Sequence, residues 1–171
     1  MSPPKPPYDA VAILSALQQH GVRFIVIGGV AANAHGSPLI TRDFDVTPDS
    51  APDNIERIAD TLIDLGARLR TPQGPVDFPI NARMLAGATA WTLSTNAGAF
   101  DLVFEPAGTR GYPDLLKQAT EFDLGVATPV LVASVIDLIR MKEAANRLKD
   151  QAALPALRQT LEEIRKREAE R

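Results

Sequence analysis

The sequence predicts an α+β fold, in which a small mixed or antiparallel sheet is flanked by helices. Apolar runs of strand length and amphipathic helical segments follow one another without the regular strand–helix alternation of a purely parallel sheet. The chain has 171 residues, a length that suits one domain. Apolar residues make up 45% and charged residues 23%, which is typical of a globular chain and excludes a disordered or fibrous one.

The first half of the chain predicts five elements. Apolar positions recur every three or four residues in its helical segments, and Gly21 and Gly66 end two of them. The run at 23–27 is apolar throughout and rich in β-branched residues, which indicates a strand buried on both faces. In chain order we expect a helix at 8–20, a strand at 23–27 that ends in two glycines, a short helix at 30–35, a strand at 42–47 and a helix at 54–65.

The second half of the chain predicts a hairpin and two C-terminal helices. The Asn96-Ala97-Gly98 segment favours a turn between paired strands, and Pro155 suits the first turn of the last helix. In chain order we expect a strand at 67–70, a loop at 71–88 with a helical turn at 82–85, strands at 91–95 and 99–104, a helix at 113–119, one or two short strands within 121–132, and helices at 134–147 and 155–166.

Domain organisation follows from the same pattern. The proline-rich residues 1–7 are predicted to be a flexible lead-in. Residues 8–171 are predicted to form one domain, with its core at about 21–132 and a C-terminal helical part at about 133–168. No targeting segment and no apolar stretch of membrane-spanning length is evident, so we expect a cytoplasmic protein with no membrane partner.

Composition restricts the chemistry that the chain can perform. There is no cysteine, which excludes disulfide frameworks, thiolate zinc sites and cysteine nucleophiles. With only two histidines, a metal site must use carboxylates, the ligands that Mg²⁺ and Mn²⁺ prefer. The net charge of −3 excludes a protein that coats nucleic acid in bulk.

Three aspartates are the candidates for such a site. In a strand, Asp43 and Asp45 project to the same face, while Phe44 between them faces the core. Two neighbouring carboxylates repel each other, so they need a cation between them or open water around them. An isolated pair of this kind is more often simply solvated. Asp101 lies in an apolar strand, where it either shares a metal with the pair or faces solvent.

Glycines and basic residues suggest a phosphate site, each with a simpler alternative. Gly28 and Gly29 join a strand to a helix, which suits phosphate binding or merely a tight turn. Lys142 lies on the apolar stripe of its helix, where a lysine either extends its ammonium group to solvent or binds an anion, such as a nucleotide phosphate. Arg140, Lys142, Arg147 and Lys149 cluster within ten residues, although they also suit a solvated helix end, and Asp150 suits a helix cap.

Two segments carry a family resemblance. Residues 27–46, IGGVAANAHGSPLITRDFDV, resemble the signature of the DNA polymerase β-like nucleotidyltransferase superfamily, and within it the small bacterial nucleotidyltransferases related to AbiE-type and Men-type toxins. Residues 138–150, LIRMKEAANRLKD, resemble that group's later motif, in which a lysine precedes an Arg-x-Lys-Asp run. The resemblance covers roughly residues 24–161 and implies the nucleotidyltransferase fold.

The resemblance also implies roles for individual residues. The implied catalytic residues are Asp43, Asp45, Asp101, Lys142 and Asp150, of which the first three bind Mg²⁺ or Mn²⁺ and Asp101 helps to activate the attacking hydroxyl. The implied nucleotide-binding residues are Gly28, Gly29, Thr41, Arg42, Lys142, Arg147 and Lys149. Leu39 departs from the pattern, since many relatives carry a basic residue there, so triphosphate binding is rearranged or weakened.

The leading functional hypothesis is a metal-dependent nucleotidyltransferase. It would transfer NMP from an NTP to an acceptor hydroxyl and release pyrophosphate, as a toxin of a bacterial toxin–antitoxin system that acts on RNA, specifically a tRNA 3′ end, with an antitoxin as protein partner. One alternative is a nucleotidyltransferase for a small, antibiotic-like molecule or a protein. Another is a non-catalytic nucleotide-binding partner protein. Base preference and oligomeric state are not predicted.

Overall fold

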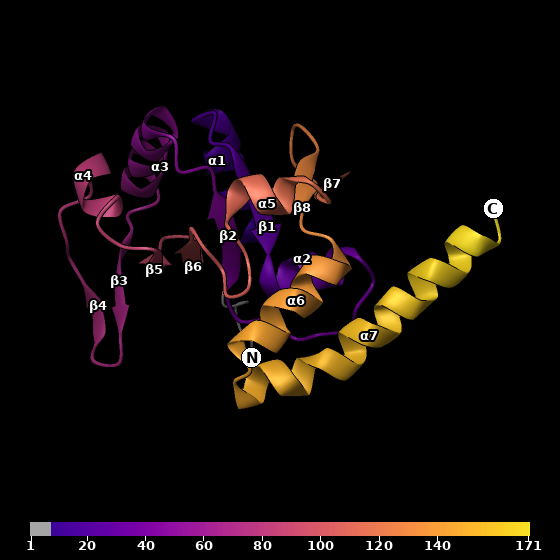
Figure 1. The fold of residues 1–171 in the computed structure, drawn as a ribbon. Coiled ribbons are helices and arrows are strands. Elements are labelled where there is room, and N and C mark those ends of the chain that lie inside the picture. Colours follow the sequence, from indigo (N-terminus) through magenta and orange to yellow (C-terminus); the bar gives the residue numbers. More distant parts are fainter. Residues whose placement is uncertain (1–7) are drawn as a thin grey trace, which may run out of the picture.

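A mixed sheet of eight strands forms the centre of the fold in the computed structural model, which describes residues 8–171 (Figure 1). The strand order is β4-β3-β5-β6-β2-β1-β8-β7. The pairs β2–β6 and β1–β8 are parallel, whereas the other neighbours are antiparallel. The predicted α+β class with a mixed sheet is therefore confirmed, and the predicted lead-in at 1–7 lies outside the described residues.

The elements follow the predicted order closely. The strands are β1 Phe24–Ile27, β2 Phe44–Pro48, β3 Arg68–Thr71, β4 Gly74–Val76, β5 Ala90–Thr95, β6 Gly98–Val103, β7 Thr120–Phe122 and β8 Val130–Val132. The helices are α1 Ala10–Gln19, α2 Gly28–Ala34, α3 Pro52–Asp64, α4 Ala82–Leu85, α5 Tyr112–Leu116, α6 Val135–Ala145 and α7 Leu148–Ala169. None of these described helices is both long and apolar enough to cross a membrane.

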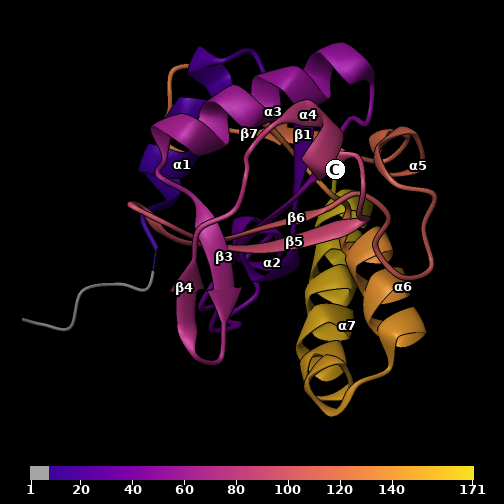
Figure 2. The ribbon, with the colours of Figure 1, turned by 90° about the vertical axis from the view of Figure 1, so that its left-hand side faces the viewer.

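The main core lies between the sheet and the helices α1 and α3. Alternate residues of β2 and β6 face it, and Phe44 and Phe100 are both fully buried with their ring centroids 5.9 Å apart. Figure 2 shows α1, α3 and α4 stacked on one side of the sheet and the pair α6–α7 on the other. This leaves the second face of β2 and β6 as the place for polar side chains, on the side where α6 and α7 lie.

Local capping explains where the helices begin. Asp9 precedes α1 and its carboxylate accepts a hydrogen bond from the Ala12 N–H at 3.0 Å. Ser134 does the same for α6, accepting from the Asp137 N–H at 3.0 Å. The predicted helix ends at Gly21 and Gly66 are confirmed, since both glycines adopt positive φ directly after a helix.

Two predicted boundaries were wrong. The segment at 71–88 contains strand β4 in addition to the predicted helical turn. Helix α7 begins at Leu148, so Pro155 lies inside the helix and not in its first turn. A proline in a helix interior removes one backbone hydrogen bond, at about 3 kcal/mol. Burial of Leu154 and Leu157 on either side of it offsets that loss.

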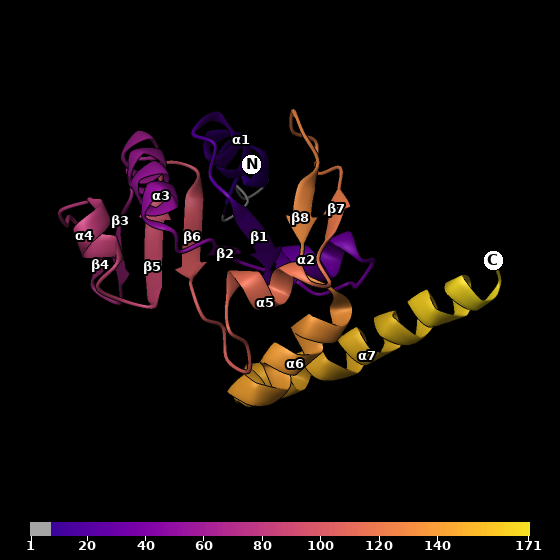
Figure 3. The same ribbon diagram turned by 45° about the horizontal axis from the view of Figure 1, so that its top comes forward.

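The far half of α7 extends past the sheet. In Figure 3 this helix runs beneath α6 and then beyond the sheet, so that the C-terminus lies away from the other elements. Only the first half of α7 therefore contributes to the region next to the carboxylates.

Candidate active site

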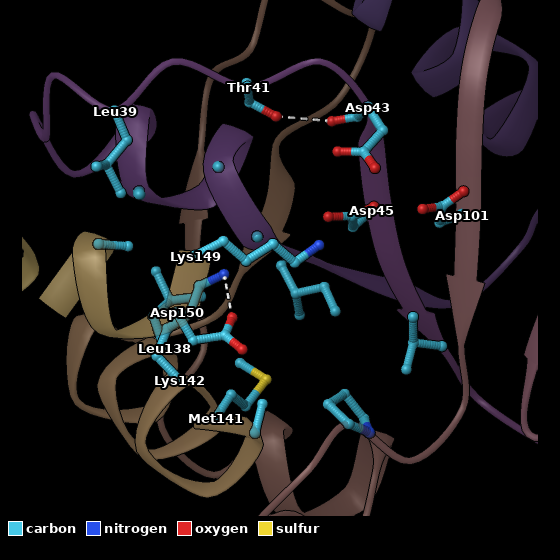
Figure 4. A pocket seen from close by; sticks show the side chains of 18 of the residues that line it. Leu39, Thr41, Asp43, Asp45, Asp101, Leu138, Met141, Lys142, Lys149 and Asp150 are labelled. Atoms are coloured by element: carbon cyan, nitrogen blue, oxygen red, sulfur yellow. Dashed lines mark hydrogen bonds and ion pairs between the residues drawn. The ribbon is translucent and has the colours of Figure 1, made fainter. Parts of the chain in front are cut away.

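Three aspartates converge on the polar face of the sheet. Strands β2 and β6 run parallel with Asp45 opposite Asp101, while their neighbours Phe44 and Phe100 pair on the core side. Asp43 lies directly before β2 and projects to the same side as Asp45 (Figure 4). One carboxylate oxygen from each of the three aspartates lies within 4.8 Å of the other two. The pairing of β2 with β6 thus brings Asp43, Asp45 and Asp101 together.

The environment of this carboxylate trio disfavours negative charge. Burial, followed by repulsion from Asp43 and Asp101, raises the pKa of Asp45 to about 7, although Lys142 opposes the change. Burial also raises the pKa of Asp101, against an opposing effect of Arg70. The chain thus leaves part of the repulsion within the trio uncompensated. A divalent cation fits these ligands, since carboxylate oxygens are what Mg²⁺ and Mn²⁺ bind.

Arg70 belongs to the site but was not predicted. Its guanidinium donates to Asp101 Oδ1 at 2.8 Å and lies 3.8 Å from Asp43 Oδ2. A second nitrogen donates to the Leu93 carbonyl oxygen at 2.6 Å. Arg70 lies in a short strand whose alternating Arg-Leu-Arg pattern indicates a polar face, but nothing in the sequence says which strand it joins. The pairing of β3 with β5 is what brings the arginine to the trio.

The two glycines make room for side chains of the site. Gly28 has φ +69°, and a Cβ atom there would lie 2.4 Å from Asp45 Oδ2. A Cβ atom on Gly29 would lie 2.4 Å from the Thr41 Cβ. Thr41 in turn donates its hydroxyl to the Asp43 carbonyl oxygen at 2.9 Å, which fixes the loop before β2. The glycines therefore serve the packing of Asp45 and Thr41, whether or not they also face a phosphate.

Lys142 finds its anion within the chain. Its ammonium donates to Asp150 Oδ1 at 3.2 Å, and Arg147 donates to Asp150 Oδ2 from its backbone N–H at 3.1 Å and from Nε at 2.7 Å. Burial alone would raise the pKa of Asp150, but these hydrogen bonds from Arg147 and Lys142 hold it at about 2. Asp150 is fully buried and caps α7. It therefore positions the two cationic side chains and is not a member of the carboxylate cluster.

A cavity of about 580 Å³ joins these groups. Figure 4 shows the trio on one side of it and the Lys142–Asp150 pair on the other. Arg42 and Lys149 are exposed residues that line it, and Leu39 contributes to an apolar wall together with side chains of α6 and α7. The predicted site residues that line the cavity are Gly28, Gly29, Thr41, Arg42, Asp43, Asp45, Asp101, Lys142, Arg147, Lys149 and Asp150.

One member of the predicted basic cluster lies elsewhere. Arg140 pairs with Asp114 at 3.1 Å and with Asp137 at 2.9 Å, and it is absent from the residues that line the cavity. Successive positions of a helix point in different directions, which separates Arg140 from Lys142 although they are two residues apart. The four basic residues therefore do not form one surface.

Comparison with known proteins adds a distant structural likeness. No protein-family model matches the chain, and a search of curated proteins found no match. The solved structure of "a putative nucleotidyltransferase (TM1012) from Thermotoga maritima" is similar to this chain at 16% sequence identity with a TM-score of 0.46, covering 88% of this chain and 89% of that one.

Proposed function

We propose that this chain is a metal-dependent nucleotidyltransferase, which transfers NMP from an NTP to an acceptor hydroxyl and releases pyrophosphate. The observation that carries the proposal is the carboxylate trio, held in register by two parallel strands and facing a cavity with cations on its far side. A phosphoryl-transfer site needs both features, since divalent ions bind carboxylates and a triphosphate needs positive charge around it. Asp43, Asp45 and Asp101 would hold Mg²⁺ or Mn²⁺.

Bound divalent ions would neutralise charge on the triphosphate and lower the pKa of the acceptor hydroxyl. The remaining steps fall to the chain's own groups. Lys142, oriented by buried Asp150, would attract the phosphates, together with Arg42, Lys149 and Arg147 at the cavity wall. Asp101, whose pKa is raised by burial, would accept the proton of the attacking hydroxyl. Its position opposite Asp45 places it beside the other two carboxylates.

Triphosphate binding is proposed to rely on the α6–α7 side of the cavity. Leu39 lines the cavity where relatives of the resembled family often carry a basic residue, so that side offers apolar contact and no charge. Lys142, Arg147 and Lys149, which line the same cavity, would supply the positive charge that Leu39 does not. This arrangement accounts for the departure at Leu39 without loss of catalytic competence.

The acceptor is proposed to be RNA, in particular a tRNA 3′ end, and the biological role that of a toxin neutralised by a cognate antitoxin. Exposed Arg42 and Lys149 at the cavity support a polyanionic acceptor. Arg140, Lys142 and Arg147 are paired with aspartates, so Arg42 and Lys149 are the side chains that would meet the acceptor's phosphates. A small molecule or a protein is the alternative acceptor.

The decisive experiment incubates the protein with each α-³²P-labelled NTP, Mg²⁺ and total RNA. Label in a tRNA-sized band is expected, and it is expected to vanish with EDTA and in Asp43→Asn. Asp60→Asn is the matched control, since Asp60 is exposed on α3 and away from the cavity. A second outcome is label in protein or in a small molecule from a cell lysate that is lost in Asp43→Asn. That result would support the transferase activity and show that the acceptor is not RNA. Triphosphate binding without transfer to any acceptor would favour a non-catalytic partner protein.

The toxin role needs a separate experiment in cells. Induced expression of the wild-type chain is expected to arrest bacterial growth, whereas Asp43→Asn is expected to have no effect at equal protein level. If the wild-type chain transfers NMP in vitro but its expression does not slow growth, the toxin role is refuted and the enzyme activity is not.

A further inference from the structure

Arg70 contacts the carboxylate trio from strand β3, whereas Lys142 belongs to helix α6. Its guanidinium is anchored at two points, the Leu93 carbonyl oxygen at 2.6 Å and Asp101 Oδ1 at 2.8 Å. Its side chain is 30% exposed and that of Asp101 only 16%, so the contact lies at the edge of the buried region. Because a backbone carbonyl oxygen holds the guanidinium in place, the side chain of Arg70 cannot move freely. It therefore restrains the carboxylate that it binds.

The register of the sheet explains why this contact is direct. Asp45 lies opposite Asp101 and Asp101 opposite Thr92, so these three side chains form a row across β2, β6 and β5. Leu69 of β3 lies opposite Leu93, which places Arg70 one position further, beside Thr92. Arg70 thus extends the row by one strand and reaches over the small Thr92 to Asp101.

The contact also changes the net charge of the carboxylate trio. Three ionised carboxylates carry three negative charges, and Arg70 offsets one of them at 2.8 Å from Asp101 and 3.8 Å from Asp43. A cation this close to two ligands of a metal ion competes electrostatically with that ion. The same cation keeps Asp101 turned toward Asp43 and Asp45. Its two effects, weaker ion binding and better alignment, have opposite consequences for metal affinity and for catalytic rate.

We propose that Arg70 is a positioning residue that aligns Asp101 for transfer and, by offsetting charge in the trio, makes divalent-ion binding depend on the nucleoside triphosphate. The inference rests on the proposed function, because it takes the trio to be a divalent-ion site. With the triphosphate present, phosphate oxygens supply further negative charge and ligands, and the ion binds in spite of Arg70. Without it, Arg70 keeps the affinity low.

Removal of the charge tests the proposal by Mn²⁺ binding in the absence of nucleotide. The free Mn²⁺ ion is counted from its electron paramagnetic resonance signal at pH 8, where carboxylates are ionised. Arg70→Gln is expected to bind Mn²⁺ at least about fivefold more tightly than the wild type, because an opposing charge is gone from a partly solvated site. In the presence of a non-hydrolysable NTP the two proteins are expected to differ less.

Two further variants control for general effects of charge. Arg68→Gln removes an arginine from the same strand, but one that pairs with Asp77 at 2.8 Å and does not contact the trio. Its Mn²⁺ affinity is expected to stay within about twofold of the wild type. Arg70→Lys keeps the charge and is expected to retain most of the wild-type affinity. Arg70→Met is a second neutral variant, used if thermal unfolding shows that Arg70→Gln is not folded.

The rate of transfer is expected to change in the opposite direction to the Mn²⁺ affinity. With Asp101 no longer restrained, kcat of Arg70→Gln is expected to fall about tenfold or more, while the Mn²⁺ concentration needed for half-maximal rate falls as well. A folded neutral variant with unchanged or weaker Mn²⁺ affinity would overturn the inference and leave the proposed function intact. If the wild type binds no Mn²⁺ even with the triphosphate analogue, the proposed function and the inference both fail.

Discussion

Substitution of Asp45 by Asn should stabilise the metal-free protein at alkaline pH. The pKa of Asp45 is raised from the ordinary 3.8 to about 7, primarily by burial and then by its two carboxylate neighbours. An acid whose pKa is raised by folding contributes stability at low pH, and that contribution is lost as the pH rises through the folded-state pKa. The wild type should therefore lose stability between about pH 4 and pH 8 in EDTA, and Asp45→Asn, which stays neutral, should lose less.

The size of the effect follows from the same values. The difference between 3.8 and about 7, at about 1.4 kcal/mol for each pKa unit, is on the order of 4 kcal/mol, as an upper bound for a carboxyl coupled to two others. For a chain of this length, each kcal/mol changes the melting temperature by roughly 2–4 °C. Asp45→Asn should thus melt on the order of 10 °C above the wild type at pH 8 in EDTA, and close to it at pH 4.

The assay is thermal unfolding by circular dichroism, at pH 4, 6 and 8, with EDTA or with Mg²⁺ and a non-hydrolysable NTP. Addition of Mg²⁺ together with a non-hydrolysable NTP at pH 8 should raise the melting temperature of the wild type more than that of Asp45→Asn, since ligand binding stabilises the folded state by mass action. Equal melting temperatures of the two proteins at pH 8 in EDTA would refute the reasoning, because they would mean that neither burial nor repulsion within the trio destabilises the ionised form of Asp45.

Three other substitutions have defined outcomes. Gly28→Ala forces a Cβ to within 2.4 Å of Asp45 Oδ2 at a positive φ, so we expect a loss of about 2 kcal/mol in urea unfolding and a large loss of transfer activity. Asp150→Ala removes the buried carboxylate that caps α7 and holds Lys142, and should lower the free energy of unfolding by about 3 kcal/mol and transfer by at least about tenfold. Phe44→Ala empties a fully buried position and should destabilise the fold by about 3–5 kcal/mol, again measured in urea, without changing the pH profile of any residual transfer.

Local sequence signals were sufficient to predict most elements and the carboxylates. The apolar run of β1, the helix ends at Gly21 and Gly66 and the alternation around Phe44 act within a few residues, so they can be recognised in the sequence alone. Asp101 lies between Phe100 and Leu102, which are both fully buried, so the alternation of the strand turns it away from the core.

Features that depend on distant contacts were not predictable. The ion pair of Arg70 with Asp101 exists because β3 joins β5, and no residue near Arg70 encodes that choice. The start of α7 was misplaced because Pro155 is a strong local signal, while burial of Leu154 against the rest of the protein is a tertiary one. Likewise, the sequence suggested a phosphate partner for Lys142, whereas Asp150 on the next helix provides the anion.

The parallel pairing of β2 with β6 has a consequence for the order of folding. Asp45 and Asp101 meet only after the chain has passed through α3, β3, β4, α4 and β5 and returned alongside β2. Closing such a long connection is slow compared with forming a hairpin, so we expect the contact to form in the later stages of folding. The repulsive trio is therefore absent while the early structure forms, and its electrostatic penalty falls on a fold whose hairpins and helices already support it. A chain released from the ribosome before β6 would carry the Asp43–Asp45 pair in open water, without the third carboxylate and without a site.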